Sequence, residues 1–265
     1  MKIANVLVST NHGPLIVNRN DENHNQEYGT YGVGWNLLQT GSFYQGDIEL
    51  LKAVLRIKKT ENAGRRPTVA VDCGANIGVH TIEFARMLDG VGDVVSIEAQ
   101  RPIYYALCGN IAINNCFNVD ARNVAIGDSN GFLRIPFIDY HKKSSFGSLE
   151  LIRGDGNENI GQSVDYDSGY EIPLISLDSL SLKCLDLIKI DVEGMEDAVI
   201  RGAIETLKLT RPIMFIEKIK SNSDKMVQTL ANLEYCLYDL GPNVLAIASD
   251  DSATHEIREL IDHHS

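Results

Sequence analysis

The sequence lacks the features that mark disulfide-rich, zinc-binding and membrane-spanning proteins. Its five cysteines are odd in number and contain no CxxC pair, which argues against a disulfide framework and a structural zinc site. No apolar run approaches the ~18–20 residues that a membrane span needs. The first residues have neither the apolar length nor the small-residue cleavage site of a signal peptide. We therefore expect a cytoplasmic protein with reduced thiols.

Positive charge is also scarce. The 265 residues contain 24 Lys and Arg against 36 Asp and Glu, so the formal net charge is −12. This balance argues against nucleic acid or an anionic membrane as a partner, because both attract basic surfaces. A small-molecule or glycan acceptor remains open, as does a homodimer. Since 44% of the residues are apolar, the chain can bury a sizeable core in one large or two small domains.

From residue 69 onward, short apolar runs alternate with segments of helical spacing. That alternation predicts an α/β fold built from βαβ units, with a parallel sheet covered on both faces. The expected strands are 68–71, 93–97, 119–126, 185–190 and 212–216, and the expected helices are 81–88, 102–115, 195–207 and 224–234. Two further apolar runs, 235–238 and 244–248, flank a Gly-Pro-Asn turn and predict a closing hairpin.

Two regions do not follow this alternation. Residues 1–68 form an N-terminal extension or lid that we expect to pack on the core, and residues 69–265 form the main domain. Residues 129–184 read as an inserted β-rich lobe at one edge of the sheet. Within the extension we expect strands at 3–8 and 15–17, a polar loop at 18–26, and a helix at 47–59 capped by Asp47. Within the insert we expect strands at 132–138 and 171–175 around a loop at about 144–169.

A glycine-rich loop after the first of these strands carries the strongest chemical signal. Gly74 and Gly78 allow a tight turn that a ligand can approach closely, but Asn76 replaces the middle glycine of GxGxxG. Asp72, just before the loop, disfavours a pyrophosphate and favours a ligand with ammonium and sulfonium groups. Glu98, 20 residues after Gly78, lies where an acid bonds ribose hydroxyls. Together these residues suggest S-adenosylmethionine.

A cluster of charged residues follows the fourth expected strand. Lys189 and Asp191 are two residues apart and therefore share a face of the strand, with Glu193 close behind. A hydroxyl acceptor needs a base, which Asp191 or Glu193 can supply, while Lys189 can keep Asp191 ionised. The alternative is that these acids cap the next helix. A Mg²⁺ ion held by Asp191 and Glu217 is chemically possible, but no diagnostic spacing supports it, so we expect no metal.

Several weaker features stay open between structural and functional roles. His80 follows the glycine loop and is more typical of helix packing than of catalysis. Asp128 ends the third expected strand, where it can meet an adenine or simply cap a turn. His141, Lys142 and Lys143 in the insert fit either a solvated loop or contacts with an anionic acceptor. The aromatic residues of the extension fit a core, a lid or a sugar-stacking surface; they are Tyr28, Tyr31, Trp35, Phe43 and Tyr44.

The chain resembles the FkbM family of S-adenosylmethionine-dependent methyltransferases. Four segments within about residues 68–218 keep the family's order: DCGANIG (72–78), EAQRP (98–102), NVAIGD (123–128) and KIDVEG (189–194) with Glu196. The resemblance implies a class I methyltransferase fold, a Rossmann-like seven-stranded sheet that is mostly parallel with an antiparallel last strand. It implies that Asp72, Gly74, Asn76 and Gly78 line the methionine end of the cofactor, with Glu98 at the ribose, Asp128 at the adenine, and Asp191 and Glu193 facing the acceptor. Ala75, Thr81, Ala99 and Ala125 complete the expected cofactor site.

The leading hypothesis is O-methylation of a carbohydrate or small-metabolite hydroxyl, with S-adenosylhomocysteine as the product. An N-methyltransferase acting on an amine or peptide is an alternative within the same class. A nicotinamide oxidoreductase shares the strand, glycine loop and distal acid, but the middle glycine is absent. A catalytically silent binding module would keep cofactor affinity without turnover.

Overall fold

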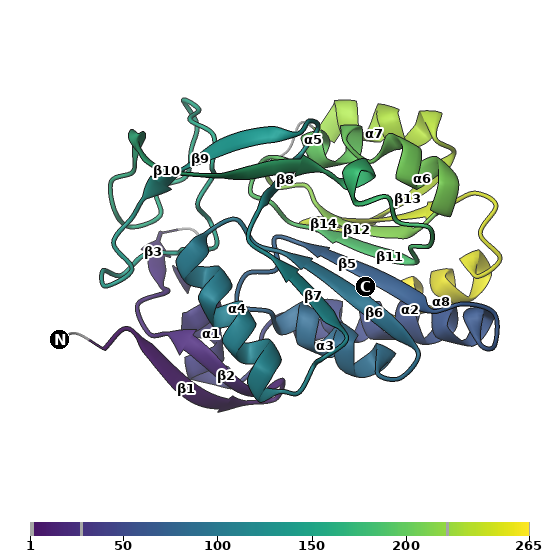
Figure 1. The fold of residues 1–265 in the computed structure, drawn as a ribbon, viewed down its shortest axis with the longest axis horizontal. Coiled ribbons are helices and arrows are strands. Elements are labelled where there is room, and N and C mark those ends of the chain that lie inside the picture. The colour runs from purple at the N-terminus through teal and green to yellow at the C-terminus, as the bar shows by residue number, and fades with distance from the viewer. Residues whose placement is uncertain (1–2, 27–28, 221–222, 265) are drawn as a thin grey trace.

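A seven-stranded sheet forms the centre of the computed structural model, which describes residues 3–26, 29–220 and 223–264 (Figure 1). Its strands are β5 (Thr68–Cys73), β6 (Gly92–Ile97), β7 (Val119–Arg122), β11 (Leu187–Ile190), β12 (Ile213–Glu217), β13 (Tyr235–Leu240) and β14 (Asn243–Ala248). Their spatial order is β13-β14-β12-β11-β5-β6-β7. The five strands from β12 to β7 pair in parallel, and β14 is antiparallel to both of its neighbours. The predicted α/β fold with an antiparallel last strand is confirmed.

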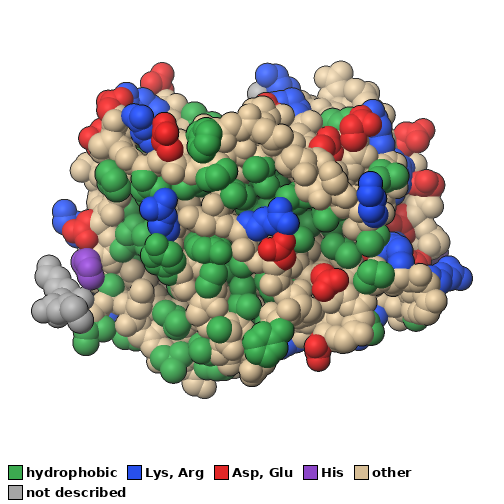
Figure 2. Space-filling model, in the orientation of Figure 1, with side chains coloured by type: hydrophobic (Ala, Val, Ile, Leu, Met, Phe, Trp, Pro, Cys, Tyr) green, Lys and Arg blue, Asp and Glu red, His purple; other side chains and the backbone are tan. Residues whose placement is uncertain are grey.

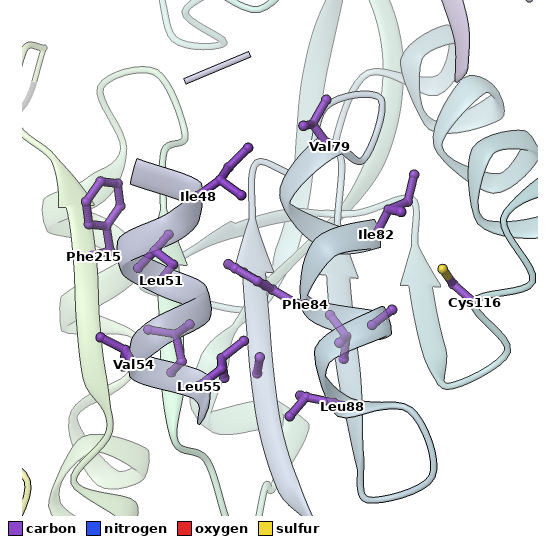
Figure 3. Packing of buried hydrophobic residues seen from close by; sticks show 14 of the residues in the cluster. Ile48, Leu51, Val54, Leu55, Val79, Ile82, Phe84, Leu88, Cys116 and Phe215 are labelled. Atoms are coloured by element: carbon purple, nitrogen blue, oxygen red, sulfur yellow. The ribbon is translucent and has the colours of Figure 1, made fainter. Parts of the chain in front are cut away.

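Helices cover both faces of this sheet. One face carries α2 (Gln45–Asn62), α3 (Val79–Leu88), α4 (Arg101–Ile113) and α8 (Thr254–His264), and the other carries α5 (Glu196–Arg201), α6 (Ile204–Thr210) and α7 (Ser223–Asn232). Side chains alternate between these layers, so Ala70 packs below β5 while Val69 and Val71 pack above it. In the lower layer, Phe84 lies between α3 and α2, on the side of α2 from which Ile48 and Leu55 project (Figure 3). All three are fully buried, and burying such a side chain contributes about 1.5–3 kcal/mol.

The N-terminal extension packs against the lower layer. It contains β1 (Asn5–Thr10), β2 (Gly13–Asn18), β3 (Asn23–Asn25), β4 (Gly29–Tyr31) and α1 (Val33–Thr40). Leu15 and Val17 of β2 belong to the same buried cluster as α2 and α3. The side chain of Asn110, on α4, hydrogen-bonds both the N–H and the carbonyl of Ile16. The boundary at residue 68 stays a prediction, since one core spans both sides of it.

A second, three-stranded sheet forms the inserted lobe. It is ordered β8-β10-β9, with β8 (Ala125–Gly127), β9 (Gly131–Phe137) and β10 (Asp165–Ser176). The long loop between β9 and β10 returns to the N-terminal extension. There Asn18 and Asn20 donate side-chain hydrogen bonds to the carbonyl of Tyr140, and Ser144 N–H donates to Asn20. The polar segment 18–26, which the sequence predicted to be a loop, therefore connects the extension to the insert through hydrogen bonds.

Several local predictions were wrong. The expected strand 119–126 is divided between β7 and β8, which belong to different sheets. The expected helix 195–207 is interrupted at Gly202, where a Cβ would lie 2.0 Å from the carbonyl oxygen of Gly127. Helix α2 begins at Gln45 with Tyr44 as its N-cap residue, so Asp47 lies in the first turn instead of at the cap. Helices α1 and α8 were not expected, because their apolar residues repeat over only two or three turns.

The outer surface mixes charge types. On the face shown in Figure 2, Lys and Arg side chains are scattered among acidic and apolar ones and do not gather in one patch. None of the helices in the described ranges combines the length and the apolar character that crossing a bilayer requires.

Candidate active site

A cavity of about 780 Å³ opens at the edge of the sheet where β5, β6, β11 and β12 end. Small-molecule sites typically have volumes of this order, about 300–1,000 Å³. Nine of the predicted site residues line it: Gly74, Ala75, Asn76, Glu98, Ala99, Ala125, Lys189, Asp191 and Glu193. Four others do not appear in its wall: Asp72, Gly78, Thr81 and Asp128. The structure therefore brings the glycine loop and the acidic segment into one cavity.

The glycine loop passes directly against the acidic segment. Gly74 has φ of 77°, and a Cβ at this position would lie 1.7 Å from the carbonyl oxygen of Asp191. Only glycine fits this close approach, so the loop and the segment after β11 hold fixed positions relative to each other. The N–H groups of Gly74 and Ala75 both donate to the carbonyl of Ile97, which anchors the loop to β6. Asn76 adopts the left-handed conformation at φ 50°, which asparagine tolerates better than most residues.

Glu98 follows β6 directly and forms part of the cavity wall. Its two oxygens accept hydrogen bonds from the N–H groups of Asn76 (2.9 Å) and Gln100 (2.7 Å). Burial raises the pKa of Glu98 to about 7, and the two amide donors offset only part of that effect. The Asn123 side chain donates to the carbonyls of Glu98 and Ala99, which fixes the turn. Each carboxylate oxygen keeps a lone pair for a further donor such as a ribose hydroxyl.

Asp72 lies behind the cavity. Its side chain is fully buried, accepts a hydrogen bond from Thr81 Oγ1 (2.7 Å), and lies 3.6 Å from Lys189 Nζ. Burial raises the pKa of Asp72, while Lys189 and Thr81 act in the opposite direction. Gly78 is the N-cap residue of α3, with φ of 94°. Asp72, Gly78 and Thr81 thus support the glycine loop from beneath.

Asp128 lies outside the cavity, at a turn after β8. Its carboxylate is about half exposed and lies 2.8 Å from a nitrogen of Arg201, whose proximity lowers the pKa of Asp128. Cavity residues on this side are instead apolar, among them Val124, Ala125 and Ile126. The adenine contact expected for Asp128 stays a prediction, and in this arrangement its carboxylate pairs with Arg201 outside the cavity wall.

Lys189 links two carboxylates at the base of the cavity. Its Nζ lies 3.1 Å from Asp191 Oδ2 and 3.6 Å from Asp72 Oδ1. Burial alone would lower the pKa of Lys189, but the charges of Asp191 and Asp72 raise it above its usual value. Lys189 therefore carries a full positive charge, and its amine is no base at neutral pH.

The alternative that Asp191 or Glu193 caps the next helix does not hold within the described residues. Helix α5 begins at Glu196, and its N-cap residue, Met195, makes no side-chain cap. The Glu196 carboxylate instead accepts hydrogen bonds from the N–H groups of Val192 and Gly194, which folds the loop. Asp191 and Glu193 are consequently left facing the cavity.

Glu217, at the end of β12, joins Asp191 and Glu193. One carboxylate oxygen from each lies within 4.8 Å of the others. Burial and the charge of Asp191 raise the pKa of Glu217 to about 8, and the same two causes raise the pKa of Glu193 well above its usual value. Sequence reasoning considered Glu217 only as a metal ligand with Asp191. The expectation that Glu217 would lie beside Asp191 is confirmed, because β11 and β12 are adjacent parallel strands whose ends project into one space.

The extension and the insert also contribute to the cavity wall. Tyr31, Phe43 and Tyr44 form an aromatic wall, whereas Trp35 is not part of it and Tyr28 lies outside the described residues. The insert contributes Ser145, Ser148 and Glu158. His141, Lys142 and Lys143 are exposed and do not appear in the wall, and Lys143 pairs with Glu22.

His80 also lines the cavity. Its side chain is only 7% exposed, and its Nε2 has no hydrogen-bond partner among the described residues. Burial, with the charges of Lys189 and His12, lowers the pKa of His80 well below its usual value. His80 is therefore a neutral imidazole at physiological pH. The packing role favoured by sequence accounts for its contact with Phe84, but not for its place in the wall.

A family model and several solved structures are similar to this chain. The family model described as the methyltransferase FkbM domain matches residues 72–263. Similar solved structures include a methyltransferase FkbM from Methylobacillus flagellatus KT, at 18% identity over 70% of this chain and 45% of that chain, with a TM-score of 0.49. The chain thus spans less than half the length of that protein.

Two further solved structures are similar at lower identity. One is an O-methyltransferase from Bacillus cereus in complex with SAH (16% identity, 78% of this chain, 83% of that chain, TM-score 0.43). The other is a precorrin-6y C5,15-methyltransferase from Geobacter metallireducens GS-15 (14% identity, 75% of this chain, 88% of that chain, TM-score 0.40). The search of curated proteins gave no match.

Proposed function

This chain belongs to the FkbM methyltransferase family, and on that premise we propose that it transfers the methyl group of S-adenosylmethionine to a hydroxyl of a small molecule or glycan. The observation that carries the proposal is the meeting of Glu98 and Asp191 in one cavity, on opposite sides of the glycine loop. One side of the cavity then suits a nucleoside and the other suits an acceptor that must lose a proton.

The residues present fit S-adenosylmethionine. Gly74 brings bare backbone to the cavity wall, and the Glu98 carboxylate is held by two amides with lone pairs left for ribose hydroxyls. Ala99, Ala125 and Ile126 give the cavity an apolar part of its wall, which suits an adenine. When bound, the cofactor supplies a methyl carbon on a positively charged sulfur, which leaves as a neutral thioether once the acceptor oxygen attacks.

The chain's own residues must hold the acceptor and remove its proton. Asp191 and Glu217 both reach the cavity, and a base works best when its pKa lies near the operating pH. Burial and the charge of Asp191 raise the pKa of Glu217 to about 8, and Asp191 lies 3.1 Å from Lys189 Nζ. We assign proton removal to the Asp191–Glu217 pair and orientation of Asp191 to Lys189.

The presence of carboxylate bases favours oxygen over nitrogen as the acceptor atom. A hydroxyl is a poor nucleophile until its proton is removed, whereas a neutral amine attacks without a base. An N-methyltransferase would therefore tolerate Asp191→Asn, and an O-methyltransferase would lose most of its turnover. A silent binding module would bind S-adenosylhomocysteine and be indifferent to the substitution.

Titration calorimetry tests the cofactor first. We expect S-adenosylhomocysteine to bind wild-type protein in the micromolar range, and Glu98→Ala to weaken that binding at least about tenfold, or about 1.4 kcal/mol. Glu205→Gln, an exposed carboxylate distant from the cavity wall, is the matched control and retains wild-type affinity. Binding of NAD⁺ in place of S-adenosylhomocysteine would overturn the proposal and favour hydride chemistry.

A further inference from the structure

Two large apolar side chains stay exposed where the cavity meets solvent. Tyr44 is 64% exposed and Ile219 is 63% exposed, and both belong to the cavity wall. In the described ranges of the chain, the other large apolar side chains that are exposed lie outside this wall. Apolar surface beside a cavity can stabilise a bound ligand, because the ligand removes that surface from water.

These two side chains adjoin the carboxylates to which we assign proton removal. Ile219 follows Glu217 by two residues, and Tyr44 directly precedes helix α2. Burial raises the pKa of the Tyr44 phenol above its usual value, and the carboxylates of Glu217 and Asp191 act in the same direction. The phenol is therefore neutral and lies within electrostatic range of both acids. An acceptor whose hydroxyl reaches Asp191 brings its neighbouring atoms close to Tyr44.

The backbone of Tyr44 has a conformation that bulky residues rarely adopt. Its φ is 38° and its ψ is 53° at the N-cap position of α2, where extended backbone is usual. Such strain persists only where surrounding contacts impose it, and it gathers at ligand sites. Here the Phe43 N–H donates to His12 Nε2 (3.2 Å), and the ring centroids of Phe43 and Tyr44 are 4.4 Å apart. The Tyr44 ring is thus held in place before any ligand arrives.

The residues on either side of Ile219 are anchored by ion pairs. Lys218 Nζ lies 2.6 Å from a carboxylate oxygen of Asp239, and Lys220 Nζ lies 2.7 Å from one of Glu193. These contacts hold the backbone on both sides of the exposed Ile219 side chain. They also pair both ammonium groups, so the surface around Ile219 favours neither an anion nor a cation.

The turn between β13 and β14 lies beside both segments. The carbonyl of Pro242, an exposed residue of this turn that also lines the cavity, accepts a hydrogen bond from the Lys218 N–H (3.0 Å). The side chain of Asn243 donates to Asp47, in the first turn of α2 (3.2 Å). Three segments far apart in the sequence thus form one apolar rim of the cavity, which consists of Tyr44, Ile219 and Pro242.

The size and charge of the apolar rim suit a small uncharged group. A stable protein interface buries about 800 Å² on each partner, which is far more than three side chains can offer. A single ring or a short alkyl chain has the matching size. Because the neighbouring lysines are paired, this group needs no charge of its own to bind there.

Building on the proposed function, we propose that the acceptor is an uncharged polyol with an apolar substituent, which lies on the apolar rim while the hydroxyl to be methylated lies at Asp191. Tyr44 and Ile219 then determine specificity, since they contact the substituent and distinguish it from a plain sugar. An aromatic substituent gains most, because rings pack favourably on one another in offset or tilted arrangements.

Calorimetry on the S-adenosylhomocysteine complex tests the inference with glycosides that differ only in their apolar group. The probes are the methyl and phenyl forms of β-glucopyranoside, β-galactopyranoside and α-mannopyranoside. We expect at least one phenyl glycoside to bind at least about tenfold more tightly than its methyl partner. Tyr44→Ala and Ile219→Ser should each remove most of that preference, and Tyr44→Phe should keep it. Leu209→Ser is the matched control, because Leu209 is 65% exposed but lies outside the cavity wall.

Equal binding within every pair, or no binding of any phenyl glycoside, overturns the inference. A preference that survives both Tyr44→Ala and Ile219→Ser also overturns it, because the ring then binds elsewhere. Self-association that both substitutions abolish, measured by sedimentation, would make a second copy of the chain the occupant and overturn it as well. These outcomes leave the proposed function intact as long as S-adenosylhomocysteine binds. If it does not bind, the proposed function fails, and the same titrations on the free protein still decide whether the apolar rim binds an apolar group.

Discussion

Lys189 and Asp72 are direct partners across the β11–β5 ladder, and their side chains lie 3.6 Å apart beneath the cavity. Both are almost completely buried. The first strand of the domain and the strand that ends in the acidic segment are thus joined by a buried ion pair. Lys189 also lies 3.1 Å from Asp191. The ion pair therefore connects the support of the glycine loop to the acidic segment after β11.

Replacing this lysine should destabilise the protein strongly. Lys189→Met leaves Asp72 buried without a cation, which costs about 3–5 kcal/mol of unfolding free energy. Lys208→Met is the control, because its pair with Glu205 is exposed and contributes at most about 1 kcal/mol. Urea denaturation measures both. Adding Asp72→Asn to Lys189→Met should recover much of the loss, and a small cost in the single variant would contradict the role assigned to the pair.

Cofactor affinity should be insensitive to Asp128. We expect Asp128→Asn to bind S-adenosylhomocysteine within about twofold of wild type, since its carboxylate pairs with Arg201 outside the cavity wall. Calorimetry under the conditions used for Glu98→Ala measures the difference. A tenfold loss would place Asp128 at the adenine after all, as the family resemblance implies.

The pH dependence of methyl transfer should reflect the ionisation of Glu217. A base must be ionised to take a proton, and the pKa of Glu217 is about 8 in the free protein. We therefore expect kcat/KM to fall as the pH drops below about 8, and this limb to disappear in Glu217→Gln. A profile unchanged in Glu217→Gln would assign the base to Asp191 alone.

Asp21 should make folding stability depend on pH. It accepts hydrogen bonds from the N–H groups of Gly34 and Phe146, and burial raises its pKa from 3.8 to about 6. A carboxyl group whose pKa is raised on folding stabilises below its unfolded pKa, and that contribution is lost as the pH rises through the folded pKa. Relative to Asp21→Asn, wild type should lose about 3 kcal/mol between about pH 3.5 and pH 7.

Urea denaturation of both proteins across this pH range measures the difference. Asp178→Asn is a useful control, because Asp178 also accepts hydrogen bonds from backbone N–H groups, those of Glu205 and Thr206, but near the surface. A constant difference between wild type and Asp21→Asn would show that Asp21 titrates normally in the folded protein.

Local patterns in the sequence predicted the parallel strands at the centre of the sheet and the two segments that meet at the cavity. The strands β5, β6, β11 and β12 are short continuous apolar runs, and such runs alternating with helices have few ways to fold. Asp72 to Gly78 and Lys189 to Glu193 follow two of these strands directly. Their approach at one edge follows from the parallel pairing alone.

Those patterns could not predict contacts between segments that are far apart in the sequence. The asparagines at 18 and 20 look like turn formers locally, yet they hold the loop near Tyr140, some 120 residues away. Asp128 lies where the family resemblance implies an adenine contact, and its carboxylate lies 2.8 Å from Arg201, a residue of a later helix. Neither contact can be predicted from the residues adjacent in the sequence.

The sequence by itself determined the short apolar strands, the glycine loop and the acids that follow β11, because each depends on residues close together along the chain. The tertiary structure decided the spatial order of the strands and which of these residues reach the cavity, where it also places Glu217, His80, Tyr31, Phe43 and Tyr44. The physical reason is that burial and charge balance depend on neighbours in space. Burial and the charge of Asp191 raise the pKa of Glu217, and Asp191 lies close because β12 pairs with β11.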